Sequence, residues 1–436
     1  MKSKNRREKI PIHIINLNHR IDRRSNIRKE FSKRSQFDIH FIEPVSNGNA
    51  KVSLWYTILF LVKSALDSGK DYIIICEDDH QFTKDYSFDV FINSLDEAAR
   101  LKADVLLGGA SSINSVFQVS DRLLWVESFT GLQFTVLFNQ IFSIVLEAKF
   151  ESNDCADIKL SKLSEKIFLI FPFISVQKDF GYSDVTELNN NERRVESLFL
   201  DSKRAIDYVL DLQNFYGFID TVDNNIQTFD YLLTVHVINY NNRSHKSNPI
   251  VGQFIEKSEF DVVYYNLLDE KRYENSIWLN IKEAIQSAID QDEDIVIICD
   301  VDHIFTCFYR KEVLIQNILE AHLQGCDILC GGIGNEFSHA LPVTKNRYWI
   351  NQFITTNFFV VYKKIFQRII ETPFDNMKTY RESISHITAN KMVIFPFISE
   401  SSSPKIAENP SEKEDVSAWK RFQKVGQAAR NYLNLI

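Results

Sequence analysis

The sequence predicts an α/β protein of two similar domains, each built on a mixed, mostly parallel sheet. Three observations predict this fold class. Short apolar runs alternate with amphipathic helical patterns, the same segments return once at a nearly constant distance, and the central apolar runs end in clusters of acids. Strands that alternate with helices need crossover connections, which are typical of parallel sheets.

An internal repeat divides the chain. The related segments HIINLNHR and HVINYNNR begin at His13 and His236. The pair YIIICEDDHQFT and IVIICDVDHIFT keeps the same offset in residue number, and so does the pair ADVLLGGA and CDILCGGI. The two FPFIS segments, at Phe171 and Phe395, have a slightly longer offset, which indicates one inserted residue in the second copy. A period this long predicts two domains, each with its own core.

The repeat also predicts the domain boundaries. We expect a first domain over residues 10–185 and a second over residues 231–403. We expect residues 186–230 to form a helical linker and residues 404–436 to form a C-terminal helical segment. Each of these two segments contains a polar stretch followed by a helical pattern.

Local patterns predict the elements inside each copy. PIHIINL and LLTVHVIN are short apolar strands. Residues 53–67 carry apolar side chains at helical spacing, with Ser53 as the expected N-cap and Gly69 just past the end, and residues 276–290 match them. DYIIIC and DIVIIC are continuous apolar runs, which suit parallel strands buried on both faces.

Composition excludes several classes of protein. The net charge of −8, with 44% hydrophobic and 25% charged residues, argues against a disordered chain and against a partner held by bulk charge such as nucleic acid. The six cysteines form no Cys-x-x-Cys pair, so we expect neither zinc nor disulfides. The basic start, MKSKNRREKI, is not followed by an apolar core, so neither a signal peptide nor a transmembrane helix is predicted. We expect a cytoplasmic protein whose basic start allows peripheral contact with an anionic membrane surface.

Acidic motifs follow the central strands of both copies. The first strand ends in EDD, up to Asp79, and the second in DVD, up to Asp302. Ligands of open α/β sheets bind beyond the carboxyl ends of strands, and adjacent carboxylates there repel one another unless a cation joins them. Oxygen ligands favour Mg²⁺ or Mn²⁺. Asp79 and Asp302, identical in the two copies, are the expected metal ligands, although aspartates after a strand also cap turns.

Polar residues near these motifs are candidates for holding phosphates. Arginine can hold phosphate with its planar fork, but a solvated helix start explains the same residues. His80 and His303 are either partners of the acidic groups or polar turn residues. The expected donor-binding residues are Asn16, Arg20, Arg23, Glu77, Asp78, Asn239, Arg243 and Asp300.

Motifs of the first copy resemble those of glycosyltransferase family 25, which includes lipopolysaccharide-biosynthesis and procollagen galactosyl transferases. IINLNHRIDRR is similar to the family's opening signature, and EDD is similar to its acidic motif. Asp157 to Leu160, followed by IFLIFPFIS, resembles a later pattern. The matches in the opening signature are Ile15, Asn16, Leu17, Arg20, Asp22 and Arg23.

The resemblance implies a function as well as a fold. It implies two tandem GT-A-like domains, a nucleotide-sugar donor such as a UDP-sugar, and a glycan or other hydroxyl-bearing acceptor. It also implies transfer with inversion, with Asp157 as the catalytic base. The second copy departs from the pattern, because Tyr240 replaces the leucine and Arg381 stands where Asp157 aligns.

Other functions remain open at this point. The chain is either bifunctional, with a transferase in each copy, or carries a non-catalytic glycan- or nucleotide-binding scaffold in one or both copies. A sugar nucleotidyltransferase is also α/β with acidic metal ligands, but its glycine-rich basic loop after the first strand is missing here.

Overall fold

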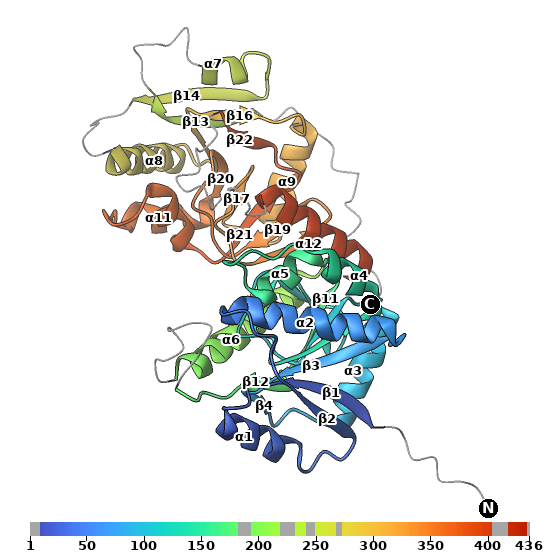
Figure 1. Cartoon of the computed structure of the whole chain (residues 1–436). Helices are drawn as coiled ribbons and strands as arrows, with labels where there is room; N and C mark the ends of the chain where they lie inside the picture. Colours follow the sequence, from blue (N-terminus) through green and yellow to red (C-terminus); the bar gives the residue numbers. More distant parts are fainter. Residues whose placement is uncertain are drawn as a thin grey trace, which may run out of the picture. The chain divides into compact units, whose positions relative to one another are not determined.

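A computed structural model describes residues 9–181, 193–218, 232–240, 249–266, 273–402 and 417–433. The chain divides into two compact units, here called domain one (residues 1–214 and 428–436) and domain two (residues 215–427). In Figure 1 the colours run along the sequence from blue to red. The predicted boundaries near residues 185, 230 and 403 fall in segments outside the described residues. In the part of the chain that is described, no helix is long and apolar enough to cross a membrane.

Domain one is built on a mixed eight-stranded sheet. Six strands run in one direction, and β8 and β10 run against them. All residues of Ile73–Cys76 in the central strand are buried, as the continuous apolar run predicts. In spatial order the strands are β2 (Phe37–Ile42), β1 (Ile10–Ile15), β3 (Tyr72–Glu77), β10 (Phe134–Phe138), β5 (Val105–Leu107), β11 (Ile167–Ile170), β8 (Leu123–Val126) and β7 (Val116–Gln118).

Domain two repeats this sheet strand for strand. Cys76 in β3 and Cys299 in β15 occupy the same place in two separate sheets, which confirms the prediction of two similar α/β domains. The two antiparallel strands are again in corresponding places. In spatial order the strands are β14 (Phe260–Asn266), β13 (Leu233–Tyr240), β15 (Ile295–Asp300), β20 (Phe358–Tyr362), β17 (Ile328–Cys330), β21 (Lys391–Ile394), β19 (Arg347–Ile350) and β18 (Ala340–Thr344).

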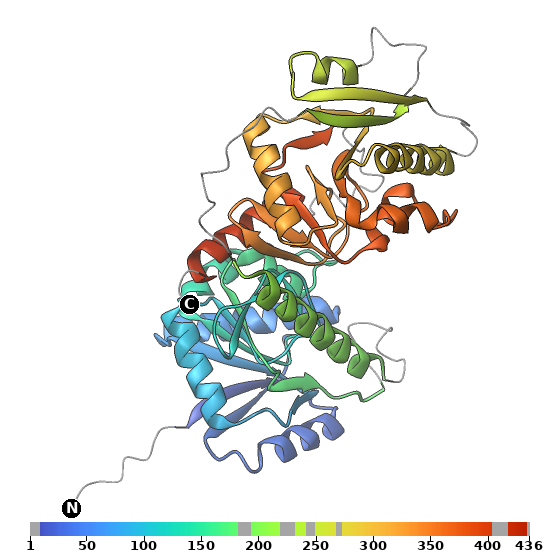
Figure 2. The ribbon, with the colours of Figure 1, turned by 180° about the vertical axis from the view of Figure 1, so that it is seen from behind.

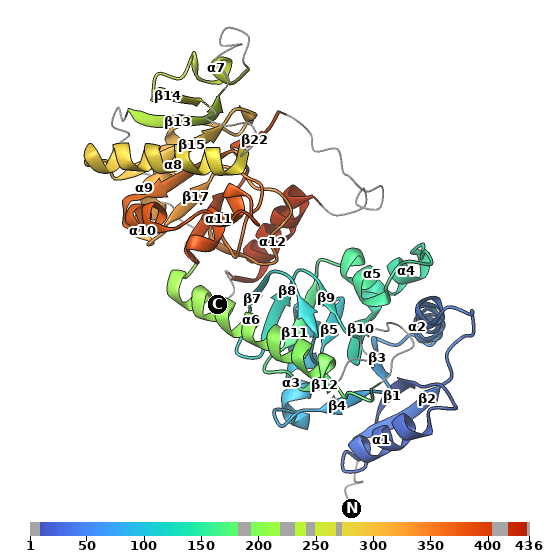
Figure 3. The same ribbon diagram turned by 90° about the vertical axis from the view of Figure 1, so that its left-hand side faces the viewer.

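Helices cover both faces of each sheet (Figures 1, 2 and 3). In domain one, α2 (Ala50–Asp67), α4 (Asn139–Glu147) and α5 (Ala156–Leu163) contact one another on one face, and α1 (Ile21–Phe31), α3 (Phe88–Arg100) and α6 (Arg194–Tyr216) lie on the other. In domain two, α8 (Tyr273–Asp290), α10 (Phe366–Glu371) and α11 (Tyr380–Ile387) contact one another in the same way. Among the described residues, the remaining helices are α7 (Pro249–Phe254), α9 (Lys311–Leu323), the 3-10 turn η4 (Lys363–Ile365) and α12 (Ala418–Tyr432).

Short two-stranded ladders complete each domain. β4 (His80–Phe82) pairs with β12 (Ser175–Gln177), and β16 (His303–Phe305) pairs with β22 (Ser399–Ser401). A further pair in domain one joins β6 (Ser112–Ile113) to β9 (Phe129–Thr130). The first two ladders begin directly after the acidic motifs and therefore hold those motifs against the segments that follow FPFIS.

The long helices start earlier than predicted. Helix α2 begins at Ala50, and the side chain of Asn49 accepts hydrogen bonds from two backbone N–H groups of its first turn. Ser53, the predicted N-cap, lies inside the helix. The prediction was wrong because Asn49 already satisfies the free N–H groups one turn before Ser53. Helix α8 likewise begins at Tyr273, ahead of the predicted start at Ser276.

The pairing of corresponding strands locates the inserted residue of the second copy more closely. Val116 pairs with Val126 in β7 and β8, and Ala340 pairs with Ile350 in β18 and β19. These corresponding strand pairs already have the longer offset in residue number, whereas Gly332 keeps the shorter one. The insertion therefore lies within residues 333–339, after β17.

A buried histidine predicts how domain two responds to acid. His236 lies in the middle of β13, with its Nδ1 atom 3.2 Å from the hydroxyl oxygen of Tyr265. Burial lowers the pKa of His236 to about 4, although Asp261 acts in the opposite direction. The unfolded chain therefore binds a proton below pH about 6.5 that the folded domain does not take up until pH about 4.

We expect acid to destabilise domain two through His236. Its contribution is fully present above pH about 6.5 and is lost toward pH 4, at up to about 1.4 kcal/mol per pH unit. Urea unfolding at several pH values between 7.5 and 4.5 measures this slope. His236→Gln should have a shallower slope than the wild type. Equal slopes for the two proteins would show that His236 does not contribute.

Candidate functional site

The acidic motif of domain one lies at the carboxyl ends of two parallel strands. β1 and β3 run side by side, so the residues that follow them meet at one edge of the sheet. A cavity of about 760 Å³ lies at this edge. The predicted site residues that line it are Arg20, Arg23, Glu77, Asp78, Asp79 and Asp157.

Asp78 contacts three of the other predicted donor-binding residues through its carboxylate. Arg23 Nη1 donates to Asp78 Oδ1 at 2.8 Å, and Asn16 Nδ2 donates to Asp78 Oδ2 at 2.9 Å. Arg20 Nη1 lies 3.5 Å from the same Oδ2 atom. Asn16, Arg23 and Asp78 are all buried. Asp78 therefore fixes the orientation of the two arginines at the cavity wall.

The carboxylate of Asp79 has fewer hydrogen-bond partners than that of Asp78. Its Oδ2 atom lies 3.4 Å from Arg23 Nη1, and its buried Oδ1 atom has no hydrogen-bond partner among the described residues. Burial raises the pKa of Asp79 to about 6, against the opposing charge of Arg23. An acceptor oxygen buried without a partner is costly, and a cation would supply the missing contact.

Glu77 is a further carboxylate of the cavity. Its Oε2 atom accepts a hydrogen bond from Gln177 Nε2 at 3.2 Å. Burial, together with the charges of Asp79, Asp157 and Asp78, raises the pKa of Glu77 well above its usual value. The charges of the neighbouring acids therefore add to the effect of burial on Glu77, and a cation in the cavity would offset both.

These residues fit a divalent cation of the Mg²⁺ or Mn²⁺ kind. Such ions bind one or two protein carboxylates and take their remaining ligands from water or substrate phosphates. In the described part of the chain, no group of three or more His, Cys, Asp or Glu side chains is arranged to hold an ion by itself. Asp79, with Glu77 beside it, would therefore hold the ion together with ligands from outside the protein.

Asp157 lies on the wall of the same cavity, at the start of helix α5. Its Oδ2 atom accepts from the N–H group of Gly131 at 3.0 Å, and its Oδ1 atom accepts from the N–H group of Ile158 at 2.8 Å. The carboxylate is thus held in place by backbone groups. The two segments that resemble family 25 motifs, far apart in sequence, meet in this one cavity.

The acidic motif of domain two has different partners. Asp300 Oδ2 accepts from the Tyr380 hydroxyl at 2.7 Å and also from Arg381 Nη2. Asp302 Oδ2 accepts from the Ser401 hydroxyl at 2.8 Å, and its buried Oδ1 atom has no hydrogen-bond partner among the described residues. Arg381 already offsets the charge of Asp300, so the second carboxylate that Glu77 would supply to a cation in domain one is occupied in domain two. The side chain of Asn239 and all of Arg243 lie outside the described residues.

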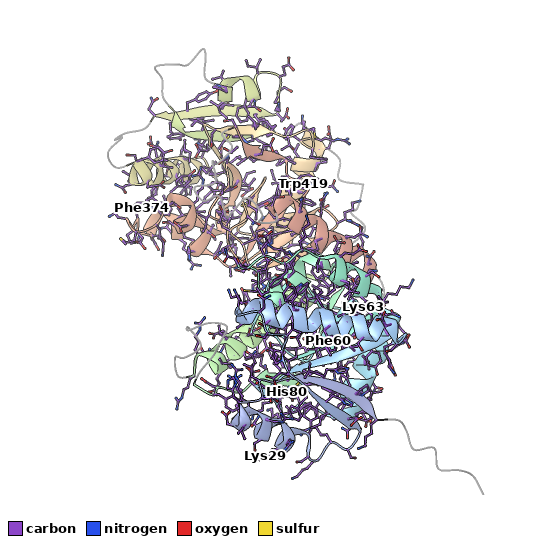
Figure 4. The ribbon with its side chains drawn as sticks, in the orientation of Figure 1. Lys29, Phe60, Lys63, His80, Phe374 and Trp419 are labelled. Carbon is purple, nitrogen blue, oxygen red and sulfur yellow. The ribbon has the colours of Figure 1, made fainter. Side chains whose placement is uncertain are left out.

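The two histidines after the acidic motifs belong to the core. His80 and His303 are buried, and each Nδ1 atom lies close to a serine hydroxyl, 2.7 Å from Ser175 Oγ and 2.8 Å from Ser399 Oγ. His80, labelled in Figure 4, lies inside domain one. Burial lowers the pKa of both histidines to about 3. Each histidine contacts a serine of the strand with which its own strand pairs, and neither is exposed to a ligand.

Sequence patterns did not single out two other residues of the domain-one cavity. Gln177 contacts Glu77, and Arg194 of helix α6 lines the same cavity. Gln177 lies in β12, just after the repeated FPFIS segment, so its place beside the acidic motif depends on the β4–β12 ladder. No residue pattern marks Arg194, which is far from Glu77 in sequence, as part of the site.

Comparisons with known proteins give no family. No family profile and no curated protein sequence matches the chain. Among solved structures, an apo UDP-glucose pyrophosphorylase is similar at 11% identity over 46% of this chain and 82% of its own, with a TM-score of 0.27. A glycosyltransferase involved in glycosylation of the major capsid of PBCV-1 is similar at 9% identity over 31% and 63%, with a TM-score of 0.21.

A third solved structure, a mannose-1-phosphate geranyltransferase from Thermus thermophilus, is similar at 9% identity over 59% of this chain and 90% of its own, with a TM-score of 0.24. These comparisons therefore do not identify the chain as a member of glycosyltransferase family 25. At these scores the likenesses add no weight to any function, so the function is inferred from the site.

Proposed function

We propose that domain one is a glycosyltransferase that moves a sugar from a nucleotide-sugar donor, a UDP-sugar, to a hydroxyl group of a glycan or similar acceptor. One observation carries the proposal: Asp79 presents a buried, unsatisfied oxygen beside a cavity that also contains Glu77, Arg20 and Arg23. The cavity volume of about 760 Å³ is within the range of small-molecule sites. Acids for a cation and arginines for phosphates are the groups that bind a diphosphate.

The residues of the cavity divide the work. Asp79 and Glu77 would hold Mn²⁺ or Mg²⁺, which when bound offsets the charge of the departing diphosphate. Arg20 and Arg23, oriented by Asp78, contact the donor phosphates through their guanidinium groups. Asn16 Nδ2 donates a hydrogen bond to Asp78 Oδ2 and so helps to hold that carboxylate in place.

Asp157 is the proposed base. It removes the proton of the acceptor hydroxyl while the new bond forms at the anomeric carbon and the bond to the diphosphate breaks. Attack on the face opposite the diphosphate gives inversion. The cavity position of Asp157 and its resemblance to the family pattern support this role.

We expect Asp157→Asn to lower kcat by about 10²-fold or more while donor affinity changes little, because a positioned base contributes about 10²–10⁴ to rate. An asparagine oxygen can still accept one of the two backbone N–H bonds, so the fold should persist. Steady-state kinetics and donor titration measure the two effects separately. Full turnover would remove Asp157 from this role, and a product with the donor's anomeric configuration would refute inversion.

Domain two carries a second candidate site at Asp300 and Asp302. It is either a second transferase, which makes the chain bifunctional, or a module that only binds a nucleotide or glycan. Separate Asp79→Ala and Asp302→Ala variants distinguish these cases. A bifunctional chain loses a different product in each variant, whereas a binding module leaves every product of Asp302→Ala unchanged.

A binding panel tests the proposed donor. The full chain is titrated by calorimetry with UDP-, GDP- and CMP-sugars, with and without Mn²⁺. We expect Mn²⁺-dependent binding of a UDP-sugar that is lost in Asp79→Asn. The matched control is Asp89→Asn, the same change at an exposed position of helix α3. If the wild type binds none of the nucleotide sugars, the transferase proposal is wrong.

A further inference from the structure

We infer that Arg381 takes the place of a divalent cation in domain two, so that this domain binds its anionic ligand without a metal ion. Arg381 Nη2 bonds Asp300 Oδ2, the carboxylate at the end of β15. The proposal that this ligand carries phosphate rests on the proposed function. The replacement of the cation rests on the contacts of Arg381 alone.

Neighbouring residues hold the Arg381 side chain in place. Its Nε atom donates to the backbone carbonyl of Thr356 at 2.8 Å, and its Nη2 atom also donates to Asn357 Oδ1 at 3.2 Å. The guanidinium lies over the ring of Tyr380, whose hydroxyl bonds the same oxygen of Asp300. The charge is therefore fixed beside the acidic motif as a bound ion would be.

Domain one has opposite charge at the corresponding place. Arg381 is the second residue of helix α11, and Asp157, which aligns with it, is the second residue of helix α5. The strand ends correspond as well, because Glu77 aligns with Asp300. Domain one thus pairs two carboxylates, whereas domain two pairs a carboxylate with an arginine. Glu77 and Asp157 both line the domain-one cavity, so their like charges repel one another unless a cation lies there.

The position of Arg381 is unfavourable for its own helix. The first turn of a helix carries partial positive charge and favours acids such as Asp157. An arginine there is repelled by the helix and is stabilised instead by Asp300, while the charge of Asp302 also acts on it. The first turn of helix α11 therefore gives no reason for an arginine at this position, whereas the carboxylates of the acidic motif do.

Arg381 can also contact a ligand. Its side chain is 19% exposed, and its Nη1 atom has no hydrogen-bond partner among the described residues, although Nε and Nη2 are occupied. A guanidinium with free N–H donors binds the oxygens of phosphate directly. The ligand class is the same as that of domain one, a phosphate-bearing compound, but without the need for a bridging cation.

Counting Mn²⁺ sites tests the inference. The full chain is titrated with Mn²⁺ alone, and bound ion is measured by electron paramagnetic resonance. We expect one site per chain in the wild type, none in Asp79→Asn, and one in Asp302→Asn. Arg381→Asp restores the charge pattern of domain one and should bind a second ion. The control Arg368→Asp makes the same charge change at an exposed position of helix α10 and should add no site.

Two results would overturn the inference: a loss of bound Mn²⁺ in Asp302→Asn, or no additional ion in a folded Arg381→Asp. Circular dichroism establishes folding, and Asp302→Asn decides the question alone if Arg381→Asp is unfolded. Failure of the proposed function is distinguishable. If Asp79→Asn binds no nucleotide sugar in EDTA while the Mn²⁺ counts are as expected, the ligand assignment is wrong and the arginine replacement stands.

Discussion

Replacing Asp79 with Ala should abolish Mn²⁺-dependent donor binding and lower turnover by at least about 10²-fold, the effect of removing one group that stabilises developing charge. The reason is the position of its carboxylate. Asp79 Oδ1 is buried, has no hydrogen-bond partner among the described residues and lies on the cavity that holds Arg20 and Arg23. Calorimetry with a UDP-sugar and steady-state kinetics measure the two losses.

Thermal unfolding separates this functional effect from damage to the fold. Asp79→Ala removes a poorly satisfied charge, so its melting temperature should equal or exceed that of the wild type. The matched variant Asp78→Ala removes the partner of Arg23 and Asn16 and should destabilise domain one. Retained Mn²⁺-dependent donor binding in Asp79→Ala would contradict the metal assignment. A lower melting temperature for Asp79→Ala than for Asp78→Ala would contradict the inference that the Asp79 carboxylate is poorly satisfied while the Asp78 carboxylate is well paired.

Gly109→Ala and Gly332→Ala should each destabilise their own domain by about 3 kcal/mol or more, because the backbone leaves no room for a methyl group. A Cβ atom at Gly109 would lie 1.9 Å from the carbonyl oxygen of Ser175, and one at Gly332 would lie 2.1 Å from that of Ser399. Both contacts are with backbone atoms, which cannot rotate away. Urea unfolding of each variant measures the loss.

Gly252→Ala is the matched control for the two glycines. It lies in helix α7, and no atom would come within 4 Å of an added Cβ atom. Alanine is the better helix former, so this variant should be unchanged or stabilised by up to about 1 kcal/mol. Equal unfolding midpoints for Gly109→Ala, Gly332→Ala and Gly252→Ala would show that the close approach at the first two glycines is absent in solution.

Much of the fold could be predicted from the sequence because the repeated segments include the strands of each sheet. The constant offset that relates Cys76 to Cys299 places two like strands in two like sheets, and the strand orders agree. The antiparallel direction of β10 and β20 could not be predicted, because a short strand has the same residue pattern in either direction. The N-cap at Asn49 was missed because several polar residues precede the helix.

The place of the candidate site could be predicted from the sequence, but the side-chain contacts within it could not. Parallel strands end at one edge, so Asp79 and Arg23 had to lie near each other. That Arg23 and Asn16 bind Asp78 depends on side-chain directions that spacing does not give. The contact of Arg381 with Asp300 joins residues 81 positions apart and follows only from where helix α11 begins.

The most direct test of transferase chemistry in domain one is phosphorus NMR of a UDP-sugar incubated with the full chain and Mg²⁺, with water or an added glycoside as acceptor. A glycosyltransferase breaks the bond between the anomeric carbon and the diphosphate, so UDP should appear in the wild type, and the UDP that domain one forms should be absent in Asp79→Ala. A nucleotidyltransferase breaks a bond within the diphosphate. Formation of UTP and sugar 1-phosphate after addition of pyrophosphate, without UDP, would contradict the proposed function.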